Sequence, residues 1–387
     1  MPSSILFVHQ GYELYGSDRT LIQSVQAAAS RWPFARITVL LPRDGALRME
    51  LLSVVNDVRI VDLAVLRKSN LKNMKLRDVG GFITKLLEAR RMMRAYDVTY
   101  INTVVIMDYL LAAGTVRRPC IVHVHEIPTG VQALLFSVLL AISRALLVFN
   151  SHATRRGFLL PFWQRKAIVW NGVAAPAQIG QPRPHEQLNL LLIGRFNSWK
   201  GQQVLLRAVA QLSSEQRARI HVRLVGSVFA DQAHFAEELA RIIAEHSLSQ
   251  TVEVFPFTSD PSPHYSWADV VVVPSTQPEP FGLVAVEAMA AARSVIAANH
   301  GGLSEIVIDG VTGSLVLPGS TESLAAAIVR YLEYPARATG EGSAGRARFA
   351  AEFEEARYKL KIADIIADST ESTKPVLRRN GEADFRR

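Results

Sequence analysis

At 387 residues the chain is long enough for two domains, since one domain usually takes roughly 100–200 residues. Its composition, 49% hydrophobic and 20% charged, is typical of a globular α/β protein and excludes an intrinsically disordered one. The single cysteine, Cys120, excludes an internal disulfide framework and a cysteine-based zinc cluster, and the net charge of +8 calls for an anionic partner, either lipid head groups or nucleic acid.

The N-terminus is predicted to form a strand followed by a loop that contains two glycines. Ile5–Val8 is apolar and lacks the features of a signal peptide, so we expect a cytoplasmic protein. The loop His9–Arg19 contains Gly11 and Gly16 and precedes a helix over Thr20–Ala29. Glycines at this place let the backbone approach a ligand closely, although they could equally serve only to make the turn.

Apolar strand-like runs then alternate with helical segments. These runs are Ile37–Leu41, Val58–Val61, Thr99–Asn102, Ile121–His125 and Ala145–Phe149. Such alternation predicts a parallel sheet with crossover helices.

Two histidines lie near the end of one predicted strand. Period-two alternation places His123 and His125 on the same face, and a structural role is the simpler interpretation for one of them. Glu126 follows His125 directly, but two adjacent residues cannot share a helix face and we find no third ligand. We therefore predict no metal site.

Two segments of this half suggest a membrane surface. Arg67–Arg94 mixes basic with long apolar residues, and its helical part is amphipathic, although it could be the solvated face of a core helix. Val131–Ile142 is the most apolar run but is shorter than the roughly 18 residues that a membrane span requires. Because no nucleic-acid-binding module is recognisable, we favour lipid over nucleic acid.

The second half begins after a segment rich in proline and glutamine, Val173–Gln187, which is typical of an interdomain linker. The strands predicted after it are Leu190–Ile193, His221–Val225, Val252–Phe255, Val270–Val273, Ser294–Ala298 and Leu315–Leu317. Helices are predicted over Thr321–Tyr334 and Phe353–Ala367, and the polar tail after them is predicted to be disordered.

Two cations follow the first strand of this half. Arg195 and Lys200 lie on a loop or first helical turn after Leu190–Ile193, where they can converge with a helix N-terminus on one anion. The alternative is that both are ordinary surface cations.

The densest motif is the stretch after Val270–Val273, where three prolines forbid a helix until about Phe281–Gly282. Glu279 lies just before that start and Glu287 in the second helical turn. Most glutamates at such places only cap the helix or face solvent.

The first amides of this helix, those of Gly282, Leu283 and Val284, are natural donors to phosphate or hydroxyl oxygens. Carboxylates beside them would accept hydrogen bonds from sugar hydroxyls. Together they suggest a nucleotide-sugar site.

The motif E-P-F-G-L-x-x-x-E-A-M-A, followed by G-G-L-x-E, resembles the signature of glycosyltransferase family 4. The resemblance implies an α/β protein of GT-B architecture, with two Rossmann-like domains facing each other across a cleft. We expect an N-terminal acceptor-side domain over 1–173, a linker over 174–187, a nucleotide-sugar-binding domain over 188–367 and a disordered tail over 368–387.

The resemblance also implies roles for particular residues. His125 and Glu279 would contact the reacting sugar, and Glu287 would bind the ribose hydroxyls. The other donor-binding residues would be Gly16, Arg195, Lys200, Gly282, Leu283 and Val284. At Gly16 the family usually has a glycine pair, and here Tyr15 replaces the first glycine. No cofactor and no metal is expected, because the nucleotide diphosphate sugar is itself the substrate.

The sequence therefore predicts a retaining glycosyltransferase for cell-surface polysaccharide or glycolipid assembly. Its partners would be a nucleotide sugar, a sugar or lipid-linked acceptor and an anionic membrane, with no nucleic acid, and its place the inner face of the plasma membrane. A nucleotide-sugar epimerase or a non-catalytic membrane adaptor are the alternatives. A dehydrogenase is disfavoured, since HQGYELYG lacks the G-x-G-x-x-G pattern.

Overall fold

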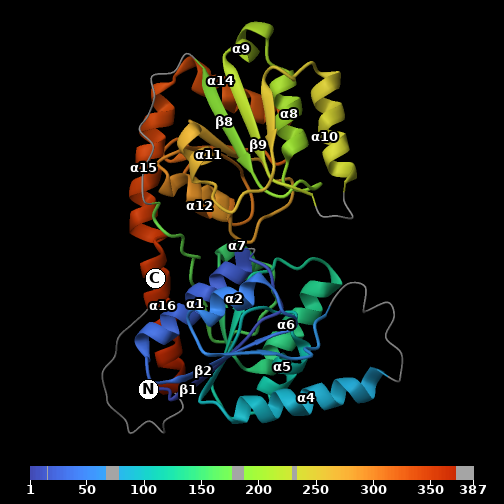
Figure 1. The fold of residues 1–387 in the computed structure, drawn as a ribbon, viewed down its shortest axis with the longest axis vertical. Helices are drawn as coiled ribbons and strands as arrows, with labels where there is room; N and C mark the ends of the chain where they lie inside the picture. The colour runs from blue at the N-terminus through green and yellow to red at the C-terminus, as the bar shows by residue number, and fades with distance from the viewer. Residues whose placement is uncertain (15, 67–77, 177–186, 229–232, 372–387) are drawn as a thin grey trace. The chain divides into compact units, whose positions relative to one another are not determined.

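The structure is a computed structural model that describes residues 1–14, 16–66, 78–176, 187–228 and 233–371. Its internal contacts divide the chain into two units (Figure 1). Unit 1 comprises Met1–Phe149, Gly157–Val169 and the chain from Lys359 onward, and unit 2 comprises Asn150–Arg156 and Trp170–Tyr358. This division differs from the expected border near residue 173, because a short piece of the N-terminal half packs with unit 2 and the C-terminal helix returns to unit 1. Most of the predicted linker, 177–186, lies outside the described residues.

Unit 1 is built on a seven-stranded sheet in which every neighbouring pair is parallel, in the order β3-β2-β1-β4-β5-β6-β7. The strands are β1 (Ser4–Val8), β2 (Arg36–Leu41), β3 (Asp57–Ile60), β4 (Val98–Ile101), β5 (Cys120–Val124), β6 (Leu146–Phe149) and β7 (Lys166–Ile168). All residues of β1, β4 and β5 are buried, as expected for strands covered on both faces. The six strands predicted for this half correspond to β1–β6 and are confirmed, and only β7 was not predicted.

The helices of unit 1 cover both faces of this sheet. They are α1 (Gly16–Arg31), α2 (Ala46–Leu52), α4 (Asp78–Arg94), α5 (Met107–Ala113) and α6 (Val131–Ser143). Because crossovers are right-handed and the strand order reverses after β3, α1 and α2 lie on one face and α4, α5 and α6 on the other (Figure 1). The first part of the predicted basic segment, 67–77, lies outside the described residues, and its remainder forms α4.

Unit 2 contains a six-stranded parallel sheet in the order β10-β9-β8-β11-β12-β13. Its strands are β8 (Leu188–Ile193), β9 (Ile220–Val225), β10 (Val252–Phe255), β11 (Val270–Val273), β12 (Ser294–Ala298) and β13 (Gly313–Val316). The strand order changes direction between β8 and β11, so the loops that leave these two strands meet at one edge of the sheet.

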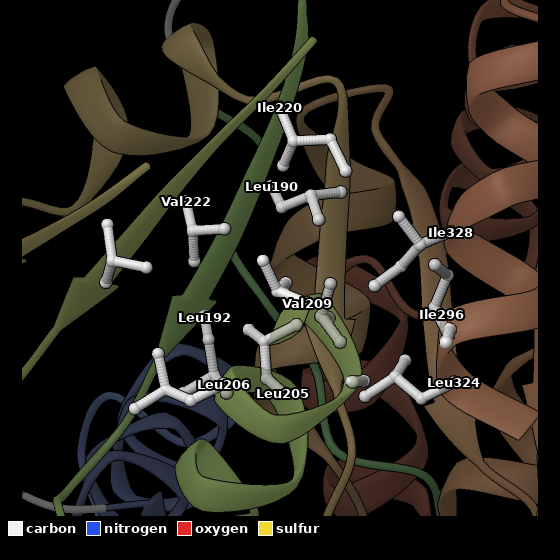
Figure 2. Packing of buried hydrophobic residues seen from close by; sticks show 14 of the residues in the cluster. Leu190, Leu192, Leu205, Leu206, Val209, Ile220, Val222, Ile296, Leu324 and Ile328 are labelled. Atoms are coloured by element: carbon white, nitrogen blue, oxygen red, sulfur yellow. The ribbon is translucent and has the colours of Figure 1, made fainter. Parts of the chain in front are cut away.

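The helices of unit 2 are α7 (His152–Arg156), α8 (Gln202–Ala210), α9 (Ser214–Ala218), α10 (His234–Glu245), α11 (Ser262–Trp267), α12 (Leu283–Ala290), α13 (Leu303–Ile306), α14 (Thr321–Glu333) and α15 (Ala336–Glu352). On one face of the sheet, α8, α10 and α14 pack on Leu190, Leu192, Val270 and Val272. Figure 2 shows the α8 residues Leu205, Leu206 and Val209 beside Leu190 and Leu192. On the other face, α12, α13 and α15 pack on Leu191, Val271 and Val273. This alternation explains why β11 is four consecutive valines.

Two predictions for the C-terminal region need correction. The helix α15 was not predicted, because its sequence contains three glycines. At least one of these glycines is there because α15 packs closely: a Cβ on Gly342 would lie 2.3 Å from the Ala292 carbonyl oxygen. The last helix, α16, runs over Glu355–Glu371, so residues 368–371 of the predicted disordered tail are helical, and the rest of the tail lies outside the described residues.

Candidate active site

The loops after β8 and β11 are joined to each other at the point where the strand order changes direction. The Thr276 amide donates a hydrogen bond of 2.8 Å to the Trp199 carbonyl. Gly201 has a φ of 81°, and a Cβ there would lie 2.1 Å from the Pro274 carbonyl oxygen. Only glycine therefore lets the first loop approach the second so closely.

This approach brings the predicted cation Lys200 against the predicted carboxylate Glu279. The Lys200 Nζ lies 2.8 Å from Glu279 Oε1, and the two side chains are 19% and 7% exposed. The Ser275 hydroxyl donates to the same oxygen at 2.5 Å. Glu279 is thus neither a solvated residue nor a simple helix cap, and Lys200 is not an ordinary surface cation.

The G-G-L-x-E segment supports the backbone of Glu279. The Gly302 amide donates to the Glu279 carbonyl at 2.7 Å, and His300 Nε2–H donates to the Ser275 carbonyl at 2.8 Å. A Cβ on Gly301, whose φ is 60°, would lie 2.5 Å from the Glu279 carbonyl oxygen. The glycine pair is therefore required because another loop passes against it.

The helix after Glu279 begins within two residues of its predicted start. Gly282 precedes α12 with a φ of 120°, and Leu283 and Val284 form its first turn, where amides have no partner within the helix. Glu287 lies half-buried in the second turn and accepts a hydrogen bond of 2.7 Å from the Tyr265 hydroxyl on α11. This contact fixes the Glu287 carboxylate. Glu287 is therefore not a solvated residue.

Arg195 lies two residues after β8, in the same loop as Lys200. Its carbonyl accepts a hydrogen bond of 2.9 Å from Gln202 Nε2 at the start of α8. The two predicted cations thus share one loop, and this hydrogen bond joins the backbone of Arg195 to the first turn of α8.

The segment Asn150–Arg156 reaches the same loop from the N-terminal half of the sequence. The hydroxyls of Ser151 and Thr154 both donate to the Pro280 carbonyl, at 2.5 and 3.0 Å. The Glu305 carboxylate accepts the His152 and Ala153 amides, at 2.9 and 2.6 Å, and so caps the start of α7. The backbone next to Glu279 is therefore held from two sides.

Unit 1 has its own polar cluster, where the loops after β1 and β4 meet. His9 Nε2 and Asp18 Oδ1 form a buried contact of 2.7 Å. A Cβ on Gly11 would lie 2.0 Å from the same Asp18 oxygen, which explains the first glycine of the loop. Gly16 is the first residue of α1, which begins four residues before the predicted start at Thr20.

His125 follows β5 and joins this cluster through Asn102. The Asn102 Nδ2 donates to the Ser17 carbonyl at 3.0 Å, so its Oδ1 is the atom that accepts from His125 Nε2, also at 3.0 Å. The proton of the imidazole is then on Nε2, and Nδ1 is its acceptor nitrogen. Burial, with smaller contributions from His123 and His9, holds the pKa of His125 well below its ordinary value, so the ring is neutral.

The neighbours of His125 differ in role. His123 is fully buried and shares a hydrogen bond of 2.7 Å with the Tyr100 hydroxyl, as the structural interpretation expects. The Glu126 carboxylate accepts the His125 amide at 2.9 Å and the Thr103 hydroxyl. Burial raises the pKa of Glu126, and these two hydrogen bonds oppose the rise.

Sequence analysis missed five residues of the two clusters: His9, Asn102, Tyr265, Ser275 and His300. His9, Asn102 and Ser275 each lie one or two residues after a parallel strand, where such sheets bind ligands, and this position was a usable signal. His300, two residues after β12, had the same signal, whereas Tyr265 on α11 had none.

The family Glycosyl transferases group 1 matches residues 177–348. The chain is 37% identical over 183 residues to the D-inositol 3-phosphate glycosyltransferase of Kineococcus radiotolerans, covering 44% of this chain and 41% of that protein. It is 34% identical over 188 residues to the lipopolysaccharide 1,2-N-acetylglucosaminetransferase of Salmonella typhimurium, covering 43% and 49%. The matches thus span less than half the length of these relatives.

Among solved structures, the chain is similar to Anabaena Alr3699/HepE in complex with UDP, with a TM-score of 0.81 and 24% identity over 94% of this chain and 100% of that one. This similarity covers both units and establishes the fold, and the family match lies in unit 2. Residues 177–348 are therefore similar to the group 1 glycosyl transferases, and the two parallel-sheet units have the GT-B architecture that the motifs led us to expect.

Proposed function

We propose that this protein is a retaining glycosyltransferase that moves a sugar from a nucleoside diphosphate donor to an acceptor hydroxyl. The observation that supports this proposal best is the buried contact between Lys200 and Glu279 at the strand-order reversal of unit 2. It puts a cation and a hydrogen-bond acceptor within one site, next to the first turn of α12. A sugar diphosphate requires this combination.

The proposed reaction breaks the bond between the anomeric carbon and the diphosphate oxygen, so negative charge grows on the leaving group. Lys200 donates one of its three N–H groups to Glu279, and the other two can turn toward a phosphate. The amides of Gly282, Leu283 and Val284 would stabilise the same charge, as would Arg195. No metal is needed for this arrangement.

Glu279 would hold the sugar hydroxyls. Its Oε1 accepts hydrogen bonds from Lys200 and Ser275, which fixes the carboxylate and leaves Oε2 to accept from the donor sugar. Glu287, fixed by Tyr265, would accept hydrogen bonds from the ribose hydroxyls. In unit 1, the acceptor nitrogen of neutral His125 would bind a hydroxyl of the transferred sugar, and the loop before Gly16 would pass close to the donor.

The acceptor we propose is a sugar or lipid-linked intermediate of cell-surface polysaccharide or glycolipid assembly, at the inner face of the plasma membrane. The net charge of +8 and the partial relation to a lipopolysaccharide transferase support this choice. Because HepE has been solved with UDP and with UDP-glucose, uridine diphosphate sugars are the first donors to test.

The test is a thermal-shift panel of nucleotide sugars, followed by NMR of the product formed with a simple acceptor. A donor at 100 times its dissociation constant should stabilise the protein by about 2.7 kcal/mol. The anomeric configuration of the donor should be kept in the product. An inverted product would exclude the retaining class, and a donor converted to its epimer without any acceptor would favour the epimerase.

A further inference from the structure

Helix α6 has an exposed face that is entirely apolar. Val131, Leu134, Val138 and Ile142 are 83%, 56%, 47% and 46% exposed, and their spacing of three and four residues puts them on one side of the helix. The opposite side is buried in the core of unit 1, and α6 contains no charged residue. A helix on the surface of a water-soluble domain normally has polar residues on its outer face.

A neighbouring loop extends this apolar face. Leu159, Phe162 and Trp163 are 74%, 90% and 68% exposed. The two aromatic rings contact each other edge to face, with 5.1 Å between their centroids. The Leu159 amide donates a hydrogen bond of 2.9 Å to the Ser137 hydroxyl, which attaches this loop to α6. We call the exposed residues of this helix and loop the α6 surface: Val131, Leu134, Val138, Ile142, Leu159, Phe162 and Trp163.

The segment that carries the α6 surface has charges of one sign only. The sequence contains no aspartate or glutamate between Ile127 and Ile168. Within unit 1, exposed Arg144 ends α6, and exposed Arg165 and Lys166 follow Trp163 almost directly. Aromatic and aliphatic side chains beside cations are the composition of segments that lie in the interface of an anionic bilayer.

We propose that the α6 surface inserts into the interface of an anionic lipid bilayer and anchors the protein there. In the described part of the chain no helix is both long and apolar enough to cross a membrane, so insertion would be shallow. The proposal extends the membrane role within the proposed function, but lipid binding can be measured without any glycosyl transfer.

Helix α4 has a different part in this contact. On its exposed side Ile83 and Leu87 are followed at helical spacing by Arg91 and Arg94. It lies on the same face of the sheet as α6, with α5 packed against both. Its arginines would attract anionic head groups by a force that salt screens, whereas the apolar α6 surface would resist salt.

The decisive experiment is cosedimentation with vesicles of phosphatidylglycerol and phosphatidylcholine at low and high salt. The pair Leu134→Gln with Val138→Gln, and separately the pair Phe162→Ser with Trp163→Ser, should each lower the partition coefficient at least tenfold, which is about 1.4 kcal/mol. The loss should persist at high salt. Arg91→Gln with Arg94→Gln should weaken binding only at low salt.

The matched control is Phe34→Ser. Phe34 is 100% exposed and lies between α1 and β2, outside the α6 surface, so its replacement should leave the partition coefficient unchanged. Lipids brominated on their acyl chains should quench the fluorescence of the parent, and Trp163→Phe should remove most of that quenching.

Three outcomes would overturn the proposal: no binding of the parent to anionic vesicles, equal binding of parent and α6-surface variants, or a concentration-dependent dimer that these variants abolish, since a second copy would then cover the surface. Nucleotide-sugar binding by the same preparations separates the two proposals. Vesicle binding without donor binding would reject the proposed function and keep the anchor.

Discussion

The two units use the same sheet topology for opposite chemistry. In unit 2, the loops at the strand-order reversal bring together the full charges of Lys200 and Glu279. In unit 1, the loops after β1 and β4 hold a network around Asn102 that ends on the neutral imidazole of His125. Each sheet supplies the place, and the residues that follow the strands decide whether a lysine or an imidazole lies beside its carboxylates.

This difference indicates which group of a sugar nucleotide each unit could bind, the diphosphate or a hydroxyl. A leaving diphosphate needs cations and amide donors, which unit 2 supplies next to α12. The neutral imidazole of His125 donates its N–H to Asn102, so its other nitrogen can accept a hydrogen bond from a hydroxyl and orient it. The comparison can be broken by removing the charges of unit 2 or by protonating the histidines of unit 1.

The largest effect is expected for Lys200→Met. It leaves the buried Glu279 carboxylate without its cation, so the free energy of unfolding should fall by about 3–5 kcal/mol. Nucleoside diphosphate affinity should fall by roughly 10- to 150-fold, the equivalent of one charge-assisted hydrogen bond. Urea unfolding measures the free energy of unfolding, and calorimetry measures the affinity. Lys361→Met, at an exposed position of α16, should change neither. Unaltered affinity would remove Lys200 from the site.

The two glutamates of unit 2 should separate by role. Glu279→Gln keeps the size of the side chain but removes its charge, so turnover should fall by roughly 10- to 150-fold. Glu287→Gln should raise the dissociation constant of the nucleotide with less effect on turnover. Steady-state kinetics with calorimetry distinguishes these patterns, and the reverse result would exchange the two roles.

The stability of unit 1 should fall in acid. Burial lowers the pKa of His123 to about 3 and also lowers that of His125, whereas in the unfolded chain both titrate near 6.5. Below pH 6.5 these two histidines are therefore protonated in the unfolded chain but not in the folded one, so the free energy of unfolding falls as the pH falls. Each histidine should cost about 1.4 kcal/mol per pH unit.

Thermal unfolding between pH 7 and 5.5 tests this slope. Glu126 has the opposite sign: its raised pKa stabilises the folded state fully below its unfolded pKa of about 4.5, and this contribution is lost as the pH rises through its pKa in the folded state. His125→Asn should remove about half of the slope. A slope unaffected by His125→Asn and by His123→Gln would show that neither ring is held neutral.

The smallest effect is expected for Tyr265→Phe. It removes the hydroxyl that donates to Glu287, a hydrogen bond with a net contribution of about 0.5–1.5 kcal/mol. Nucleoside diphosphate affinity should fall by roughly two- to twelvefold in calorimetry. Tyr334→Phe, at an exposed position, is the control, and equal affinities of both variants would mean that Glu287 does not depend on Tyr265.

The sequence predicted the parts of the fold that a local pattern determines. The strands β8, β11 and β12 were found within two residues at each end, because largely buried parallel strands are nearly continuous apolar runs. The loops of Lys200 and Glu279 were found because prolines and glycines mark them. Contacts between distant segments had no such signal: the Tyr265 hydroxyl and the glycine-rich α15 depend on what packs against them.

The short excursion of Asn150–Arg156 into unit 2 has a consequence for engineering. The chain passes between the units after Phe149, Arg156, Val169 and Tyr358, so neither unit is one continuous piece of sequence. A chimera cut at the Pro-rich segment would separate Ser151 and Thr154 from the Pro280 carbonyl and expose the Glu305 carboxylate. To exchange unit 2 between such proteins, a designer would have to graft Asn150–Arg156 together with the chain from Trp170 to Tyr358. A simple exchange of halves would misplace the backbone next to Glu279.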